Sequence, residues 1–265
     1  MHNFMQSIYH FLLMIGIDPL KLIRRIRGSS FYLRDRKALI AQQKSAKVVF
    51  PFGKPYPILD QRFTEGGTAK GHYFHQDLLV ARRIFINQPV SHVDIGSLVN
   101  GFVAHVASFR EIEVLDIRPI LHKVHNITFV QADLMSKVPD SLINYCDSLS
   151  SLHAVEHFGL GRYGDPINYD GYLDGLTNMY NILKKGGKFY FSVPIGPQRI
   201  EFNAHRVFSV QYLVELFRDK YKIDFFSYVD DKGDLHENTS LENKDDVKNS
   251  FGCTFGCGIF EMTKL

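Results

Sequence analysis

The chain lacks tryptophan and has little cysteine, and these shortages limit its class. Among 265 residues there is no tryptophan, and the only cysteines are Cys146, Cys253 and Cys257. An odd and low cysteine count argues against a disulfide framework and favours a reducing compartment. Cys253 and Cys257 form a lone pair, with no second pair at the spacing of a zinc site, so we expect no metal. A chain of this length buries a sizeable core without cross-links.

Long hydrophobic runs are also absent. The apolar stretch from Phe11 to Ile17 is far shorter than the roughly 20 residues of a membrane-spanning helix. No small-residue cleavage site follows it, so we expect no secretory signal. The net charge is only +3, yet residues 1–47 hold nine Lys or Arg and two Asp, which leaves about −4 on the remainder. The positive charge is therefore concentrated in the amino-terminal segment.

Two interpretations of this basic segment stay open. Asp18 and Pro19 predict a helix start, and Gly28 to Ser30 predict its end. Leu20, Ile23 and Ile26 share one face of this helix, with basic residues around them. The helix is either a solvated one packed on the main domain or one that lies on an anionic membrane surface. We expect a cytoplasmic protein that contacts the inner membrane face peripherally through residues 1–30.

From residue 88 onward, strands alternate with helices. This alternation predicts a mostly parallel sheet with helices on both faces. The expected strands are His92–Ile95, Glu113–Asp116, Thr128–Gln131, Ser148–Leu152, Lys188–Val193, Lys222–Tyr228 and Gly258–Thr263. The expected helices are His72–Asn87, Phe102–Ser108, Pro119–Val124, Tyr172–Leu183 and Ser209–Lys220. Three regions result: a basic helical segment (1–47), an irregular crossing segment with a capping helix (48–87), and an α/β domain (88–265).

The loop after the first strand, in DIGSLVNGF, has fewer glycines than a nucleotide-binding loop. No Lys-Ser or Lys-Thr pair follows Gly101, so it is not a P-loop. Leu98 occupies the place of the glycine that lets a backbone approach a pyrophosphate. A ligand without phosphates does not need that glycine, and S-adenosylmethionine (SAM) is such a ligand. The loop nevertheless lies where open parallel sheets bind their ligands, beyond the carboxyl end of a strand.

Acidic residues follow the next two strands. Asp116 ends the second strand about 20 residues past Gly96, a distance at which an acid typically binds ribose hydroxyls. Asp133 follows the third strand, where it could meet the adenine amine while Leu134 covers one ring face. An acid at a strand end is often only a cap, but the order and spacing of these acids favour a nucleoside site.

The chain resembles class I SAM-dependent methyltransferases. The resemblance is carried, in order, by VDIGSLVNGFVAHVASF, EVLDIRP, FVQADL, DSLSSLHAVEH and LKKGGKFYFSVPIG. It implies a Rossmann-like fold with a seven-stranded sheet, a helical amino-terminal extension and SAM as the cofactor. The implied cofactor contacts are Asp94, Gly96, Ser97, Gly101, Asp116, Ile117, Asp133 and Leu134. HYFHQDLLVARRIF and FNAHRVFS further resemble an uncharacterised family found in bacterial surface-polysaccharide gene clusters.

Histidines near the end of the fourth strand are candidates for catalysis. Methyl transfer to an alcohol benefits from a base whose pKa lies near the working pH, and histidine is the usual one. His153, Glu156 and His157 lie just past the strand end, and His205 follows the fifth strand. The alternative is that the Glu-His pair only shapes the cofactor pocket. Arg206 is a candidate for binding an anionic acceptor, or for a salt bridge within its loop.

Three functions remain in view. We expect a SAM-dependent O-methyltransferase that acts on a sugar in surface-polysaccharide biosynthesis, with a small-molecule or glycan acceptor. A long glycine-rich loop suits sugar stacking and hydroxyl binding through Tyr163, Asp165, Tyr169 and Asp170, although loops favour these residue types in any case. The alternatives are an NAD-dependent Rossmann oxidoreductase and a non-catalytic methyltransferase-like scaffold. Nucleic acid is not an expected partner, because the basic charge does not run along a cleft.

Overall fold

The computed structural model describes residues 8–9 and 11–265 and divides the chain into two units. Unit 1 spans residues 1–68 and unit 2 spans residues 69–265, so the helix predicted at His72–Asn87 belongs to unit 2. Within the described part of the chain, no helix combines the length and hydropathy needed to cross a membrane.

Unit 1 is built on helix α2 (Pro19–Gln43), followed by an extended crossing segment that contains the short turn η1 (Gln61–Phe63). The Asp18 side chain caps the helix by accepting from the backbone N–H of Lys21, and Pro19 fills the first turn, as predicted. The predicted end at Gly28–Ser30 is wrong, because α2 continues to Gln43. Gly28 is buried there, and its missing side chain makes room for the backbone carbonyl of Leu59. Gly28 thus serves close packing inside a helix.

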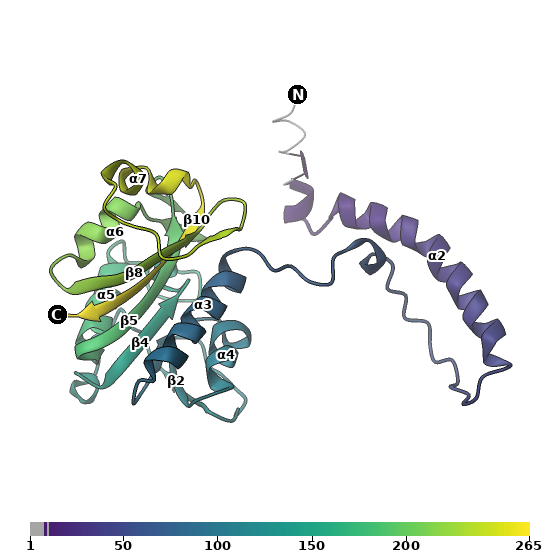
Figure 1. Ribbon diagram of the computed structural model, residues 1–265, viewed down its shortest axis with the longest axis horizontal. Coiled ribbons are helices and arrows are strands. Elements are labelled where there is room, and N and C mark those ends of the chain that lie inside the picture. Colours follow the sequence, from purple (N-terminus) through teal and green to yellow (C-terminus); the bar gives the residue numbers. More distant parts are fainter. Residues whose placement is uncertain (1–7, 10) are drawn as a thin grey trace. The chain divides into compact units, whose positions relative to one another are not determined.

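Unit 2 is centred on an eight-stranded sheet with the order β3-β2-β1-β4-β5-β10-β8-β9 (Figure 1). The first five strands in this order pair in parallel, and β10 is antiparallel to both of its neighbours. The predicted seven-stranded, mostly parallel sheet is confirmed, and the two-residue strand β9 adds an eighth. The strands are β1 (Val93–Ile95), β2 (Ile112–Asp116), β3 (Ile127–Gln131), β4 (Cys146–Leu152), β5 (Leu183–Ile195), β8 (Tyr221–Val229), β9 (Leu235–His236) and β10 (Gly256–Lys264).

Helices cover both faces of this sheet (Figure 1). On one face α3 (His72–Asn87), η2 (Val99–Val103) and α4 (Ala104–Ala107) bury a core that includes Ile84, Phe102 and Val114. On the other face α5 (Gly171–Ile182), α6 (Val210–Phe217) and α7 (Lys244–Lys248) cover a larger core with many aromatic rings. The remaining elements are the hairpin β6 (Arg199–Glu201) and β7 (His205–Val207), and the short turns η3 (Asp140–Leu142), η4 (Val155–His157) and η5 (Ser250–Gly252).

The helix predicted at Pro119–Val124 is absent, so that prediction is wrong. Ile120 packs against the core, but Leu121 is 83% exposed and Val124 is 50% exposed, so the segment buries too little apolar surface to hold a helix in place. Val124 pairs with Ile127 in a tight turn that leads directly into β3. The chain crosses from β2 to β3 without a helix and leaves the end of β2 open to the pocket described below.

A buried polar chain fastens β1 to β4. The imidazole of His92 lies 2.8 Å from the hydroxyl of Ser148 and 3.1 Å from that of Ser150. Ser150 donates in turn to Asp94 at 2.5 Å. Burial lowers the pKa of His92 to about 3, so the ring is neutral in the folded protein at neutral pH. Every member has a partner, as a buried polar group requires.

Candidate functional site

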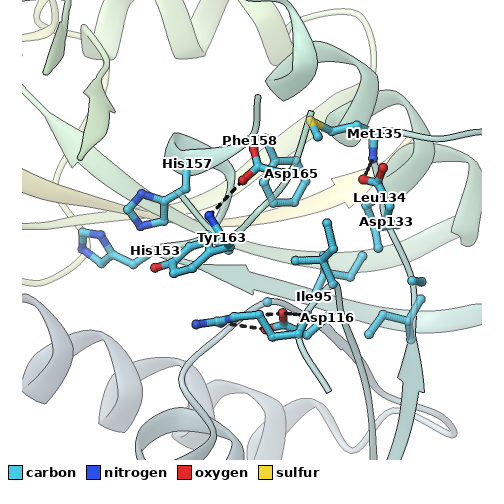
Figure 2. A pocket seen from close by; sticks show the side chains of 16 residues that line it. Ile95, Asp116, Asp133, Leu134, Met135, His153, His157, Phe158, Tyr163 and Asp165 are labelled. Carbon is cyan, nitrogen blue, oxygen red and sulfur yellow. Dashed lines mark hydrogen bonds and ion pairs between the residues drawn. The ribbon is translucent and has the colours of Figure 1, made fainter. Parts of the chain in front are cut away.

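A pocket lies beyond the carboxyl ends of β1, β2, β3 and β4, where a Rossmann-like sheet is expected to bind its ligand. Its walls are mostly apolar, with a few carboxylates and histidines. In Figure 2, His153, His157 and Tyr163 lie toward one end, Asp133 and Met135 toward the other, and Asp116 lies between them. The lining residues are Ile95, Gly96, Leu115, Asp116, Ile117, Arg118, Ala132, Asp133, Leu134, Met135, His153, Ala154, His157, Phe158, Tyr163 and Asp165.

Of the predicted residues in the loop after β1, only Gly96 lines the pocket. Its φ of 71° is left-handed, a conformation that glycine adopts without strain. Asp94 and Ser97 support the loop from behind. Asp94 accepts from the backbone N–H and hydroxyl of Ser97, and the Ser97 hydroxyl accepts from the backbone N–H of Leu152. Burial raises the pKa of Asp94 to about 6, although these donors favour its charged form.

Gly101 also lies away from the lining residues and faces Asp77 of α3. A side chain at Gly101 would place its first carbon 2.5 Å from the Asp77 carboxylate. Burial raises the pKa of Asp77 to about 6, and Gln76 donates to one of its oxygens at 3.2 Å. The second glycine of the loop therefore admits a carboxylate from α3, which a reading of the loop alone could not show.

Asp116 and Ile117 line the pocket at the end of β2, as predicted. The Asp116 carboxylate is already engaged by Arg118, whose guanidinium donates to both oxygens, at 3.1 and 2.8 Å, and whose backbone N–H donates at 2.8 Å. The same guanidinium lies 4.2 Å from the ring centre of Tyr163. A carboxylate has about four acceptor positions, so at least one remains open to a ligand hydroxyl. A second hydroxyl would have to displace the Arg118 side chain.

Asp133 and Leu134 line the pocket after β3. Both oxygens of Asp133 accept hydrogen bonds from its own loop, one from the backbone N–H of Met135 and one from the hydroxyl of Ser136. The side chain of Leu134 packs into the core, and its carbonyl accepts from Asn178 of α5. Asp133 therefore holds the loop in shape while retaining acceptor positions for a ligand.

The structure brings three of the four predicted catalytic residues together. His153 directly follows β4, and η4 carries Glu156 and His157. Nδ1 of His153 lies 2.7 Å from Glu156 Oε1, and Nε2 of His157 lies 3.7 Å from the same oxygen. Burial lowers the pKa of His153, but the neighbouring Cys257 and Glu156 side chains outweigh burial and hold this pKa well above its usual value. His153 is therefore a poor proton acceptor.

His157 has the opposite character. Its Nδ1 lies 2.6 Å from the carbonyl oxygen of Ala204, which can only accept, so Nδ1 carries the proton and Nε2 has the lone pair. Burial lowers the pKa of His157, although Glu156 and the Ala204 carbonyl partly offset this. A neutral imidazole that lines the pocket and offers Nε2 can act as a general base.

His205 and Arg206 are not lining residues of the pocket. His205 pairs with Glu201 at 3.0 Å and packs against the ring of Phe255. Arg206 is buried and donates to the backbone carbonyls of Phe158 and Tyr169. It forms no salt bridge with a described residue, so the predicted loop salt bridge is wrong, whereas binding of an anionic acceptor stays a prediction. Its guanidinium holds together the loop that closes the pocket.

The loop at residues 158–165 positions Tyr163 at the wall of the pocket. Asp165 accepts from the backbone N–H groups of Gly159, Gly161 and Tyr163. These three bonds fix Tyr163 over Arg118 at the pocket wall. Arg118 itself was missed, and the signal was its place two residues after a strand-end acid, where a side chain turns back toward the pocket.

Comparisons with known proteins agree with the fold. One solved structure, the 1,6-didemethyltoxoflavin-N1-methyltransferase of Burkholderia thailandensis with bound S-adenosylhomocysteine, has a TM-score of 0.51 at 12% identity, and the match covers 89% of this chain and 90% of that one. The [4+2]-cyclase SpnF has a TM-score of 0.50 at 13% identity, with coverage of 72% and 80%. The chain has the Rossmann-like fold of class I methyltransferases. Since one neighbour is a cyclase, the fold alone does not fix the reaction.

Sequence comparisons identify a family but no function. The model of a family described as "Caenorhabditis protein of unknown function, DUF268" matches residues 82–252. This range holds every lining residue of the pocket. A search of curated proteins gives no match.

Proposed function

The chain belongs to the DUF268 family, and we propose that its pocket binds SAM and transfers the methyl group to an oxygen of a sugar acceptor. The observation that carries this proposal is the order in which the carboxylates and histidines lie along the pocket. Asp133 and Leu134 lie toward one end, Asp116 lies in the middle, and His153 and His157 lie toward the other end (Figure 2). This order suits an adenine, a ribose and a reacting methyl group, in that sequence.

The residues present fit SAM better than a dinucleotide. Asp116 offers a carboxylate to ribose hydroxyls, and Gly96 brings the backbone close without a side chain. The loop continues after Leu98 into the short element η2 and not into a regular helix whose N-terminus could bind a phosphate. Gly101 of η2 faces the carboxylate of Asp77. A pyrophosphate would also face the carboxylate of Asp116. When bound, SAM supplies an electrophilic methyl group on a sulfonium.

His157 is the proposed general base. Its Nε2 would accept the proton of the acceptor hydroxyl, so that the acceptor oxygen could act as the nucleophile toward the methyl group that bound SAM would supply. Glu156 stabilises the resulting imidazolium from 3.7 Å. Positioning of the acceptor supplies the rest, since an in-line displacement gains most from alignment.

The sugar acceptor rests on the family resemblance and on the loop at residues 158–165. Tyr163 presents an aromatic ring beside the histidines, and an aromatic ring is a common platform for a sugar (Figure 2). We place the reaction in surface-polysaccharide assembly on the cytoplasmic side of a membrane, with the basic segment of unit 1 as the peripheral contact.

The test of this proposal uses extracts and isotope-labelled SAM. We expect a product heavier by one methyl group when the protein is present, and a turnover about 10²–10⁴-fold lower in His157→Gln. In the native protein, turnover should rise with pH through a pKa below 6.5, because burial lowers the pKa of the base and only its neutral form acts. His75→Gln, outside the pocket, is the control. A normal rate and an unchanged acidic limb in His157→Gln would exclude His157 as the base.

A further inference from the structure

Three potential metal ligands meet at a point that the proposed reaction does not use. His72 is the first residue of α3, His153 follows β4, and Cys257 lies in β10. One ligand atom from each, a ring nitrogen from each histidine and Sγ of Cys257, lies within 4.8 Å of the other two. The three elements are far apart in the chain, and the fold of unit 2 brings their side chains together.

His153 is already held as a metal ligand is usually held. Its Nδ1 bonds to Glu156 at 2.7 Å, which leaves Nε2 as the free nitrogen. This Nε2 is buried without a hydrogen-bond partner, and the side chain is only 5% exposed. A buried polar atom without a partner is uncommon and requires an explanation. A carboxylate behind a histidine is the usual support for a metal-bound imidazole, since it fixes the ring and raises its basicity.

The other two ligands have few partners outside the cluster. Cys257 is fully buried, and outside the cluster its sulfur has the distant contacts with Gln76 Oε1 at 3.8 Å and the carbonyl of Gly258 at 3.9 Å. His72 has a hydrogen bond to the backbone of Phe255. The ring of His72 stacks on that of His153, with centroids 5.2 Å apart and planes within 10°. His72 is half-buried, so it lies on the side from which an ion could enter.

We propose that His72, His153 and Cys257 bind a Zn²⁺ ion. Two imidazoles and a thiolate suit zinc and exclude the hard cations Mg²⁺ and Ca²⁺, which require oxygen ligands. In a tetrahedral zinc site with bonds of about 2.0–2.3 Å, neighbouring ligand atoms lie about 3.5 Å apart. The three atoms must therefore close by at most about 1.3 Å, a change that side-chain rotation provides.

Three protein ligands leave the fourth position of zinc open, as in catalytic rather than structural sites. Because His153 also lines the pocket, the ion would lie at the histidine end, near the expected reacting group. This site departs from the expectation of no metal that the isolated cysteine pair gave. Zinc binding does not depend on methyl transfer, so either proposal can fail without the other.

Cobalt titration of the full chain under reducing conditions is the test. With Co²⁺ as the probe, we expect one ion per chain and a thiolate-to-cobalt charge-transfer band in the near ultraviolet, displaced by an equivalent of Zn²⁺. Cys257→Ser should abolish the band. His72→Gln should weaken cobalt binding at least tenfold, and Glu156→Gln should weaken it about 10–100-fold.

Two matched controls accompany these variants. Cys253→Ser removes a buried cysteine from the same region, and His75→Gln removes a histidine one turn along α3; neither residue belongs to the cluster. Both should bind cobalt as the native chain does. His72 is only partly buried, so His72→Gln keeps the test valid if Cys257→Ser fails to fold. Absence of the band in the native chain, an unchanged band in His72→Gln or Cys257→Ser, or its loss in Cys253→Ser would overturn the proposal. Rapid alkylation of Cys257 without metal binding would instead reveal a thiolate–imidazolium pair and also overturn it.

Discussion

At the scale of single residues, the site depends on which acceptor and donor positions are already taken. Asp94 and Ser97 bond to each other, and Arg206 donates to the backbone carbonyls of Phe158 and Tyr169. Asp116 is different: it lines the pocket and has an open acceptor position beside Arg118. We therefore expect the proposed nucleoside contact to depend mainly on Asp116.

Asp116→Asn tests that assignment. A hydrogen bond to a charged group contributes about 1.5–3 kcal/mol, and about 1.4 kcal/mol is a factor of ten in affinity. We expect SAM binding at least tenfold weaker by calorimetry, with an unchanged far-ultraviolet circular dichroism spectrum. Asp140→Asn, on an exposed turn, should bind normally. Equal affinities in the two variants would remove Asp116 from the site.

His92 makes a prediction about stability and pH. Its pKa falls from about 6.5 in the unfolded chain to about 3 in the fold, so the unfolded state binds the proton first. Stability from neutral His92 is complete above pH 6.5 and is lost as the pH falls toward 3. Asp94, whose pKa is raised to about 6, has the opposite effect: its contribution to stability increases as the pH falls from about 6 to about 4. Comparing the native protein with a His92 variant that keeps Asp94 therefore isolates the contribution of the histidine to the pH dependence of stability.

We expect the stability advantage of the native protein over His92→Gln to shrink by about 2 kcal/mol between pH 7 and pH 5. The measurement is urea unfolding of both proteins at the two pH values. A constant difference would show that His92 is protonated in the folded protein or titrates normally.

At the scale of elements, helix α2 has an exposed apolar stripe and exposed basic residues that have no part in the pocket. Leu20, Ile23 and Ile26 are each more than half exposed along one stripe. Lys21, Arg24 and Lys37 are exposed and make no salt bridge with a described residue. Each basic residue near an anionic leaflet adds on the order of 1 kcal/mol of binding energy, which salt screens.

We therefore expect the full chain to sediment with anionic vesicles at low salt and to be released at high salt. Replacing Lys21, Arg24 and Lys37 with Glu should abolish sedimentation. The matched control replaces Lys184, Lys185 and Lys220, which are exposed in unit 2, and should sediment like the native chain. Equal sedimentation of both triple variants, or none by the native chain, would contradict the membrane role.

At the scale of the whole molecule, strands were more predictable than helices. Most of the strands are apolar runs bounded by polar turns, and each predicted strand exists within a few residues. The helix predicted at Pro119–Val124 was wrong because Leu121 and Val124 stay exposed and only Ile120 of its apolar residues packs against the core. The helix end predicted at Gly28 was wrong because a glycine can also serve close packing inside a helix. Such contacts depend on neighbours that a local pattern does not include.

The site also has a part that the sequence predicts and a part that it does not. Asp116, Asp133 and His153 follow strands, so topology alone places them at one edge of the sheet. The cluster of His72, His153 and Cys257 brings together α3 and β10, which lie near opposite ends of the sequence of unit 2. No spacing rule could reveal it, because the register of β10 decides which of its side chains faces α3.

The central claim is that the pocket holds SAM. The most direct measurement is a calorimetric titration of the full chain with SAM and, separately, with NAD. The account predicts saturable binding of one SAM per chain and no heat of binding with NAD. Binding of NAD without SAM, or of neither ligand, would contradict it.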